Sequence, residues 1–326
     1  MHVLVTGANG FLGRYILEEL KSQGHTSLAF VRRAHSAQQL RQEGFDVHVG
    51  RLDEPQELSE ALKKIDAVIH AAGGGKAVQP QSYFDNNVAP TRRLFEALEQ
   101  SKVKRCLLIS SLAAAGPSAQ NVPKKNDSLL NPISPYGESK AAAEGIAFQF
   151  KDILHVGILR PPAIYGPGDI RLLPLFKTAQ KGFVPVPGGL PKSLSLIHVQ
   201  DCAHAIVDAL SANYPSGSAF FVDDGTRHSM EVLVQAMGQA LHTRPKLVSI
   251  PGWCLSTIAV LSTQLARTLK RDAWLTPSKV HELLQPHWIC DSTDTQKVLN
   301  WKPKVKLDLG IRSTARWYQK QGWLKP

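Results

Sequence analysis

The sequence predicts an α/β fold with a doubly wound parallel sheet and a smaller mixed C-terminal lobe. Three observations support it. Short apolar runs alternate with helical patterns over the first 160 residues, as in a parallel sheet with helices on both faces. A glycine-rich turn joins the first strand to the first helix. After Arg160 prolines and glycines become frequent and the alternation stops. We therefore expect two intertwined parts, residues 1–160 and residues 161–326.

The elements follow from apolar periodicity. The six strands expected in the first part are Val3–Val5, Ser27–Val31, Asp46–Val49, Ala67–His70, Arg105–Ser110 and Val156–Arg160. The helices expected between them include a first one around Leu12–Leu20, then Gln56–Leu62 and Pro90–Gln100. Residues 161–191 are predicted to be loops. The later elements are a strand at Ala219–Val222 and helices at His198–Leu210, Met230–Leu241, Pro277–Leu284 and Leu309–Gln319.

The strand–turn–helix at the N-terminus carries glycines at three-residue spacing, at Gly7, Gly10 and Gly13. In a dinucleotide site the first glycine permits a tight turn and the second lets the backbone approach a pyrophosphate. The third allows close helix–strand packing, and the phosphates meet the helix N-terminus. The alternative is an ordinary βα turn that contains glycines. Because Met1 lies next to this strand, a cleaved leader would destroy the site, so we expect an intracellular, cytoplasmic protein.

Composition limits the other classes. Hydrophobic residues make up 43% of the 326 and charged residues 20%, which is typical of a globular protein. The formal net charge is +11, but the basic residues are scattered doublets, so we expect no nucleic-acid partner. The four cysteines are far apart and form no Cys-x-x-Cys pair, so neither a disulfide framework nor a metal site is expected.

Tyr136 is followed by Lys140, and this spacing places both side chains on one face of a helix. A nearby ammonium favours phenolate and should lower the tyrosine pKa from about 10. Such a tyrosine can exchange a proton with a substrate oxygen. The alternative is an exposed helical pair without a function.

Together these motifs resemble the short-chain dehydrogenase/reductase superfamily in its extended subgroup. The stretch from Asp66 to Gly73, the Asn87-Val-Ala-Pro-Thr91 helix, the Arg160–Gly168 segment and the Ser195–Asp201 segment are similar to its signatures over nearly the whole chain. Pro90 replaces the usual glycine, and we expect only a local effect. The resemblance implies a Rossmann-type domain, a substrate-binding lobe, a small-molecule substrate and a homodimer through the helices at Asn87–Glu99 and Tyr136–Phe150.

The resemblance also implies site residues. Tyr136 is expected to be the general acid/base. Lys140 is expected to lower the pKa of Tyr136 and to contact the ribose, and Ser111 to orient the substrate oxygen through its hydroxyl. The residues expected to bind the cofactor are Gly7, Asn9, Gly10, Phe11, Leu12, Gly13, Arg32, Arg33, Leu52, Ala71, Ala72, Asn87, Tyr136, Lys140 and Pro162.

The end of the second strand bears on the cofactor. A site for NAD usually has an acid there, on the ribose 2′-hydroxyl. This chain has Arg32 and Arg33 instead, which suit the 2′-phosphate of NADP. We therefore expect NADP, with NAD as the alternative. Arg51, before Leu52, replaces the aspartate of the family's turn near adenine, which leaves those contacts open.

Members of the family that bind sugar nucleotides commonly have asparagine where this chain has Ala163, after Arg160-Pro-Pro. The Arg-Pro-Pro form is similar to reductases like dihydroflavonol reductase and 3β-hydroxysteroid dehydrogenase. We expect an NADP(H)-dependent oxidoreductase that interconverts a carbonyl and a secondary alcohol on a small or mid-sized, apolar substrate. The alternatives are a nucleotide-sugar epimerase or dehydratase with tightly held NAD, and a non-catalytic nucleotide-sensing protein.

Several residues also have purely structural interpretations. Ser110 and Ser111 could cap a strand end, and His70 is expected only to end its strand. Asp201 is expected to cap a helix, and His198 and Tyr165 to pack. The apolar segment Trp253–Leu269, followed by Lys270-Arg271, is too interrupted to cross a membrane. It is a core, lid or membrane-surface helix.

Overall fold

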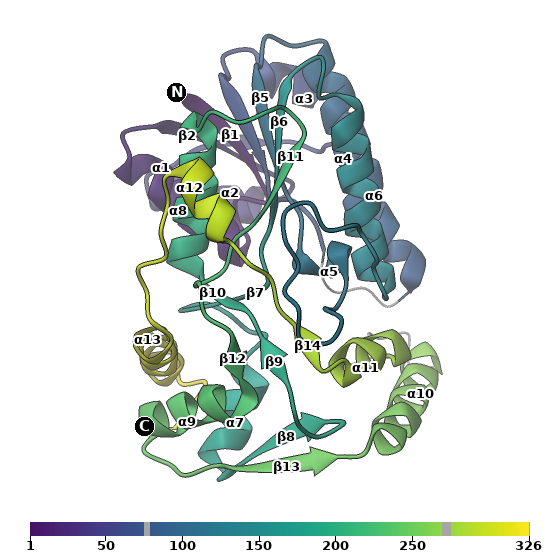
Figure 1. Ribbon diagram of the computed structural model, residues 1–326. Coiled ribbons are helices and arrows are strands. Elements are labelled where there is room, and N and C mark those ends of the chain that lie inside the picture. The colour runs from purple at the N-terminus through teal and green to yellow at the C-terminus, as the bar shows by residue number, and fades with distance from the viewer. Residues whose placement is uncertain (75–78, 269–274, 326) are drawn as a thin grey trace.

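The computed structural model describes residues 1–74, 79–268 and 275–325. Its main feature is a seven-stranded, wholly parallel sheet (Figure 1). The strands are β1 (His2–Thr6), β2 (Thr26–Val31), β3 (Asp46–Val49), β4 (Ala67–His70), β5 (Arg105–Ile109), β6 (His155–Arg160) and β11 (Ser218–Phe221). Their order is β11-β6-β5-β4-β1-β2-β3. The predicted Rossmann-type sheet is confirmed.

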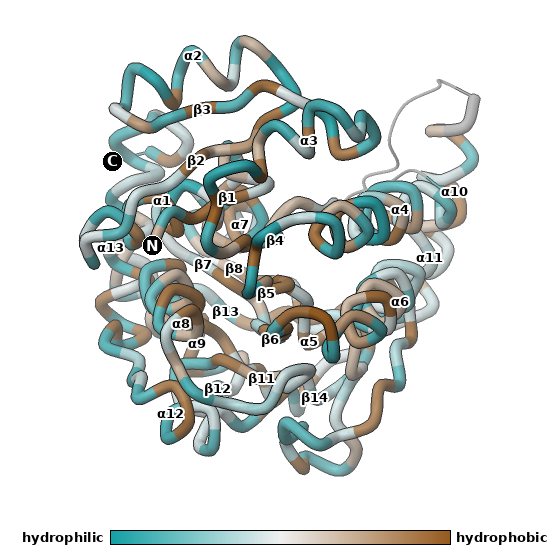
Figure 2. The backbone as a smooth tube through the Cα atoms, turned by 90° about the horizontal axis from the view of Figure 1, so that it is seen from above, coloured by the Kyte–Doolittle hydropathy of each residue, from teal (hydrophilic) through white to brown (hydrophobic). Residues whose placement is uncertain are grey.

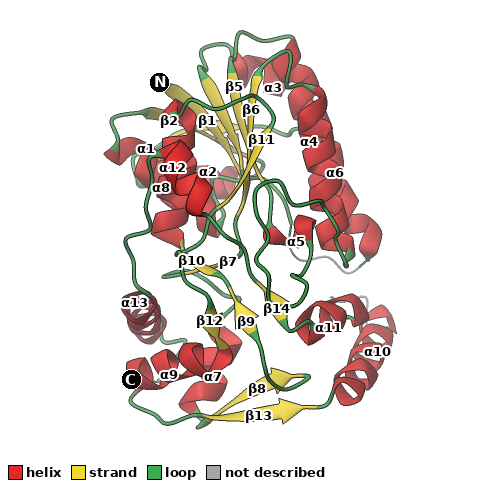
Figure 3. Ribbon diagram, in the orientation of Figure 1, coloured by secondary structure: helices red, strands yellow, loops and turns green. Residues whose placement is uncertain are grey.

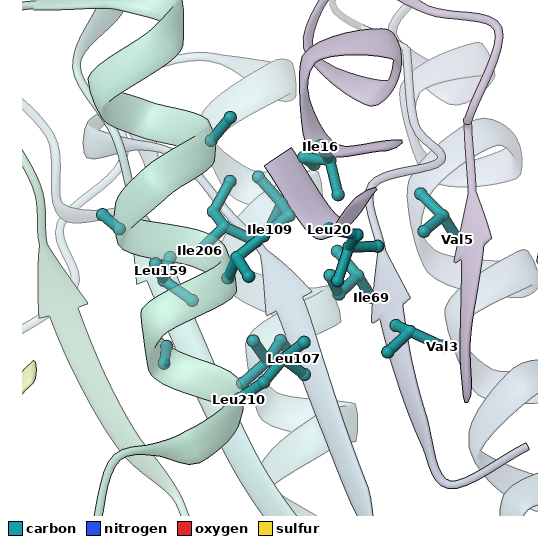
Figure 4. Packing of buried hydrophobic residues seen from close by; sticks show 14 of the residues in the cluster. Val3, Val5, Ile16, Leu20, Ile69, Leu107, Ile109, Leu159, Ile206 and Leu210 are labelled. Atoms are coloured by element: carbon teal, nitrogen blue, oxygen red, sulfur yellow. The ribbon is translucent and has the colours of Figure 1, made fainter. Parts of the chain in front are cut away.

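Helices cover both faces of this sheet (Figure 3). Those packed on one face are α1 (Phe11–Ser22), α2 (Ala34–Gln42) and α8 (Val199–Ser211), whose apolar side chains share one cluster with Val3, Val5 and Leu107 (Figure 4). Those on the other face are α3 (Pro55–Leu62), α4 (Pro80–Glu99) and α6 (Pro135–Gln149). Seen from above, the strands lie between these two helical layers (Figure 2). A short helix, α5 (Leu112–Ala115), follows β5.

The chain beyond Arg160 builds a second region below the sheet and also returns to it. Its strands are β7 (Ala163–Tyr165), β8 (Phe183–Pro187), β9 (Ser193–Leu194), β10 (Leu196–His198), β12 (His228–Ser229), β13 (Lys246–Ile250) and β14 (His287–Trp288). Its helices, apart from α8, are α7 (Leu173–Gln180), α9 (Met230–Leu241), α10 (Gly252–Thr268), α11 (Pro277–Leu284), α12 (Thr293–Leu299) and α13 (Leu307–Lys320). Since β11 completes the main sheet and α8 packs on one of its faces, the two parts of the chain are interwoven.

Two sequence expectations need correction. Residues 161–191 are not all loop, because they contain β7, α7 and β8. Pro174 lies in the first turn of α7, where a helix tolerates proline, and the proline-containing β8 pairs with β13 in a two-stranded sheet. The helix expected at Pro90–Gln100 begins ten residues earlier as α4, and Pro90 lies within it.

The apolar segment at Trp253–Leu269 forms most of α10, and Leu269 with Lys270-Arg271 lies outside the described residues. α10 packs through Leu255 and Ala259 against Val280 of α11. Its opposite side is exposed, so core packing accounts for one face alone. In the part of the chain that the structure describes, no helix is long and apolar enough to cross a membrane.

Candidate active site

The glycine turn after β1 is closed by backbone contacts. Gly7 has a φ of +68°, and a side chain there would meet the Ala71 backbone at 2.7 Å. A Cβ at Gly13 would lie 2.2 Å from the Gly7 carbonyl oxygen, so α1 packs directly on the turn. Gly10 is the N-cap residue of α1 and has no side chain to satisfy the first-turn N–H groups, and that turn contains no acid. These are the features of a cradle for an anionic group at a helix N-terminus.

Buried hydrogen bonds hold the neighbouring β4 turn against this cradle. His70 bonds to Thr6 Oγ1 at 2.7 Å and to Thr91 Oγ1 at 3.0 Å, and Thr6 Oγ1 accepts from the Ala72 N–H at 3.1 Å. Burial lowers the pKa of His70 to about 3, so its imidazole is neutral. Asn87 exchanges bonds with the Gly74 backbone and donates to Ser139 Oγ at 2.8 Å. His70 is a strand-end residue, as expected, and Asn87 ties this turn to α6.

The arginines expected to select NADP end the adjacent strand. Arg32 follows β2, and Arg33 is the N-cap residue of α2. Both side chains are exposed, and neither forms a salt bridge to any described residue. Arg51, by contrast, pairs with Asp53 through two bonds of 3.0 and 2.7 Å. At the carboxyl end of β2, Arg32 and Arg33 therefore supply positive charge that no described acid neutralises.

The remaining residues expected to bind cofactor lie around the carboxyl ends of β1, β3, β4 and β6. Asn9 donates to Ser36 Oγ at 3.2 Å at the start of α2. Partly buried side chains follow β1, β3 and β4, and a buried proline follows β6; these residues are Phe11, Leu12, Leu52, Ala71, Ala72 and Pro162. No described group of three or more His, Cys, Asp or Glu side chains could hold a metal ion.

The two serines after β5 have different surroundings. Ser110 is buried and donates to Glu144, which also pairs with Arg160 at 2.7 Å. Ser111 is the N-cap residue of α5, where its Oγ accepts from the Ala113 N–H at 3.1 Å. The Ser111 side chain also lowers the pKa of Tyr136, which places the two hydroxyls near each other. Ser111 is thus both a cap and a neighbour of the tyrosine, while Ser110 belongs to a buried ion pair.

Tyr136 and Lys140 lie one turn apart on α6, which begins at Pro135 behind the N-cap residue Ser134. The Lys140 Nζ donates to the Ile109 carbonyl at 2.6 Å, beside β5. Burial lowers the pKa of Lys140 to about 8. The pKa of Tyr136 is raised, mainly by burial, whereas we expected Lys140 to lower it. The difference arises because desolvation disfavours the phenolate, and spacing along a helix does not reveal desolvation.

Two charged residues that influence this tyrosine were not predicted from the sequence. Arg171 lowers the pKa of Tyr136, and Glu282 raises it. Arg171 follows Asp169, whose buried carboxylate accepts from the Arg171 and Leu172 N–H groups at 2.8 and 3.0 Å. Glu282 lies on α11 and accepts from Ser134 Oγ at 2.5 Å. The position of Arg171 shortly after a glycine-proline turn was a weak signal of a functional role. No local pattern indicated such a role for Glu282.

The structural interpretations of three other residues are also resolved. Tyr165 is buried and packs edge-on against His198, with ring centroids 5.4 Å apart, as expected. Asp201 does not cap α8, because His198 is the N-cap residue. The Asp201 carboxylate instead accepts from the Lys304 and Val305 N–H groups at 3.0 and 2.9 Å, which holds the segment before α13 against α8.

Known proteins are similar to this chain along most of its length. The chain is 29% identical over 325 residues to the ceramide reductase of Caulobacter vibrioides, covering 99% of this chain and 96% of the relative. It is 26% identical to the UDP-glucose 4-epimerase of Vibrio cholerae, covering 96% and 94%. The solved structure of MoeE5 in complex with UDP-glucuronic acid and NAD matches with a TM-score of 0.76 and 25% identity, covering 98% and 100%.

The family model matches residues 3–222, which include the glycine turn, Ser111, Tyr136 and Lys140. Some relatives named as reductases and others named as epimerases align along nearly the whole chain. The protein therefore belongs to the NAD dependent epimerase/dehydratase family, the NAD(P)-dependent oxidoreductases and epimerases of the extended short-chain dehydrogenase/reductase group.

Proposed function

We propose that this protein is an NADP(H)-dependent oxidoreductase that interconverts a carbonyl and a secondary alcohol on an apolar small or mid-sized substrate. The observation that supports it most is the arrangement at the end of β5, where Ser111 is near enough to lower the pKa of Tyr136 and Lys140 lies one helical turn away. A hydroxyl that can carry a proton thus has a second hydroxyl near it and a lysine on the same helix, one turn away.

The residues present fit a dinucleotide. The uncapped first turn of α1 at Gly10 would bind the pyrophosphate. The exposed Arg32 and Arg33 would bind a 2′-phosphate, which favours NADP over NAD. Phe11, Leu12, Leu52, Ala71, Ala72 and Pro162, together with Asn9 and Asn87, would line the rest of the site. Lys140 would contact the ribose of the nicotinamide.

The protein's own contribution to the reaction is orientation and proton transfer. The bound nicotinamide supplies or accepts the hydride. In the reducing direction Tyr136 donates its phenolic proton to the oxygen that was the carbonyl oxygen. Ser111 donates a hydrogen bond to the same oxygen and stabilises its developing negative charge. The ammonium of Lys140 stabilises the phenolate that remains on Tyr136.

The substrate class rests on two features. Ala163, exposed at the start of β7, has no hydrogen-bonding side chain where relatives that bind sugar nucleotides commonly place asparagine. The ceramide reductase of Caulobacter vibrioides is one of the similar proteins, and its name indicates an apolar substrate. The name of the Vibrio cholerae relative supports the second candidate, a nucleotide-sugar epimerase with tightly held NAD.

The deciding experiment compares the purified wild-type protein with the Tyr136→Phe variant. Nicotinamide fluorescence measures cofactor binding. We expect both proteins to bind NADPH exchangeably and more tightly than NADH. We expect kcat/KM for reduction of apolar ketones to fall by about 100- to 10,000-fold in the variant, because the proton donor is missing.

The alternatives give different results. Copurified NAD together with a spectral change on addition of a UDP-sugar would establish the epimerase. NADPH binding without turnover of any ketone or alcohol in the wild type would indicate a non-catalytic sensor. Near-wild-type turnover by Tyr136→Phe would refute the assigned proton donor. The cytoplasmic location and the homodimer through α4 and α6 remain predictions.

A further inference from the structure

The outward side of α10 is apolar and uncovered. Trp253 is 73% exposed, and Leu261 and Leu265 are each 60% exposed. Ile258 and Val260 add to this surface, which we call the α10 face. The buried side of the same helix is formed by Leu255, Ala259, Ser262 and Ala266. The apolar residues of α10 therefore exceed what its packing on α11 uses, and α10 lies at the periphery of the molecule in Figures 1 and 2.

Two of the polar side chains of α10, Thr257 and Thr263, are bonded within the helix, while Ser256 and Gln264 are exposed on it. The Thr257 hydroxyl donates to the Trp253 carbonyl at 3.0 Å, and the Thr263 hydroxyl donates to the Ala259 carbonyl at 2.8 Å. Because these hydroxyls already have partners within the helix, moving them out of water costs little. No charged residue occurs between Gly252 and Ala266.

The charge of the chain segment that leads to α10 favours an anionic partner. From Val232 to Ala266 the chain contains no aspartate or glutamate, but it contains the exposed Arg244 and Lys246. Lys246 is the first residue of β13, so it lies at the end of that strand away from α10, and the strand runs toward α10 in Figure 1. The whole chain has a formal net charge of +11. A second copy of the chain would bring the same Arg244 and Lys246 to such a contact, and no acid between Val232 and Ala266 to pair with them.

We propose that the α10 face docks on the surface of an anionic lipid bilayer. The exposed apolar side chains would enter the boundary between headgroups and acyl chains, with the helix axis in the membrane plane. Trp253 suits that depth, because its ring is apolar and its indole N–H can bond to headgroups or water. The basic residues would add attraction to anionic headgroups.

This docking would orient the candidate active site. α10 packs on α11, and α11 carries Glu282, which accepts from Ser134 at the start of the helix that bears Tyr136. One element thus separates the α10 face from the helix that carries the proposed proton donor. An enzyme bound in this way would meet substrates dissolved in the bilayer. Membrane docking itself does not depend on the proposed chemistry.

The test is cosedimentation of the full-length protein with vesicles of phosphatidylcholine alone or mixed with phosphatidylglycerol, at low and high salt. The test variant is Leu261→Glu/Leu265→Glu. Its matched control is Ile153→Glu/Leu309→Glu, which places the same charges on two side chains that are 54% and 53% exposed elsewhere. A second readout is quenching of tryptophan fluorescence by brominated acyl chains, compared between the wild type and Trp253→Phe.

We expect the wild type and the control to bind the anionic vesicles and to lose affinity in high salt. The test variant should bind about tenfold more weakly or worse, because two apolar contacts become charged. Quenching should largely disappear in Trp253→Phe. Equal binding by the test and control variants would overturn the proposal, as would no binding by the wild type. A concentration-dependent dimer that only the test variant loses would assign the face to a second copy instead.

NADPH binding and turnover of a water-soluble ketone are measured on each variant in the same series. Both should be unchanged in the test variant, since Leu261 and Leu265 lie outside the candidate active site. Vesicle binding without any turnover would count against the proposed oxidoreductase function and leave the docking surface intact. Turnover without vesicle binding would overturn the docking surface and leave the proposed oxidoreductase function intact.

Discussion

Residues next to each other in the sequence take up different functions because burial and partners differ. Ser110 donates to the Glu144 carboxylate, which is paired with Arg160, and is therefore part of the core. Ser111 instead caps α5 and lowers the pKa of Tyr136. Neither residue type nor order in the sequence distinguishes the two serines. Their environments depend on where β5 ends relative to α5 and α6.

Lys140 provides a prediction at the scale of a single residue. Burial lowers the pKa of its ammonium to about 8, so the lysine is charged below that pH and neutral above it. The charged form stabilises the phenolate left on Tyr136 after proton donation. We therefore expect kcat/KM for ketone reduction to fall as pH rises through about 8, measured between about pH 6 and 10.

The matched variant is Lys140→Arg, whose guanidinium stays charged throughout this range. Its overall rate should be lower, because the geometry changes, but the decrease near pH 8 should move to higher pH or disappear. A decrease that stays in place in Lys140→Arg would assign it to another group.

At the scale of an element, the β1–α1 turn depends on the absence of side chains. α1 approaches the turn so closely that a Cβ at Gly13 would overlap the Gly7 carbonyl oxygen, which is backbone and cannot rotate away. Gly145, on the exposed side of α6, has nothing within 4 Å of the equivalent position. The packing around α1 thus requires glycine at position 13, whereas nothing around α6 requires it at position 145.

We expect Gly13→Ala to lower the free energy of unfolding by about 1–3 kcal/mol and to weaken NADPH binding, because α1 must shift away from the turn. Gly145→Ala should instead raise stability by up to about 1 kcal/mol, through better helix propensity. Denaturant unfolding and NADPH fluorescence titration measure both effects. Full stability together with full NADPH affinity in Gly13→Ala would contradict the packing argument.

At the scale of the whole molecule, distant parts of the chain meet at the candidate site. Glu282, on α11, accepts from Ser134 across 148 positions of sequence and raises the pKa of Tyr136. The strand β11 completes the sheet beside β6, and Asp201 holds the segment before α13. The C-terminal half therefore shapes both the sheet and the electrostatics at the tyrosine.

We expect Glu282→Gln to lower the pKa of Tyr136, because a negative charge that disfavours phenolate is removed. Alcohol oxidation requires the phenolate as the base, so its kcat/KM should rise at lower pH in this variant than in the wild type. The amide keeps an acceptor for Ser134. Asp294→Asn, on the exposed face of α12, is the control and should leave the profile unchanged. A shift to higher pH in Glu282→Gln would show that its charge acts in another way.

Much of the first domain was predictable because its signals are local. The central parallel strands β1, β4, β5 and β6 are largely buried, so they read as apolar runs. The six predicted strands match β1 to β6 within about two residues. The glycine turn, the Tyr136–Lys140 pair and the arginines after β2 are also local patterns. Residues 161–191 were misassigned because prolines tolerated in short edge strands resemble loop prolines.

The sequence by itself therefore determined the Rossmann-type sheet, the family and the residues proposed for catalysis and cofactor binding, because each rests on spacing within one strand, turn or helix. Only the tertiary structure decided that Tyr136 is desolvated, that Arg171 and Glu282 act on it, that Asp201 binds distant backbone, and that α10 leaves an apolar face uncovered. Burial and charge–charge interactions depend on distances between segments remote in the chain, and a linear pattern does not contain those distances.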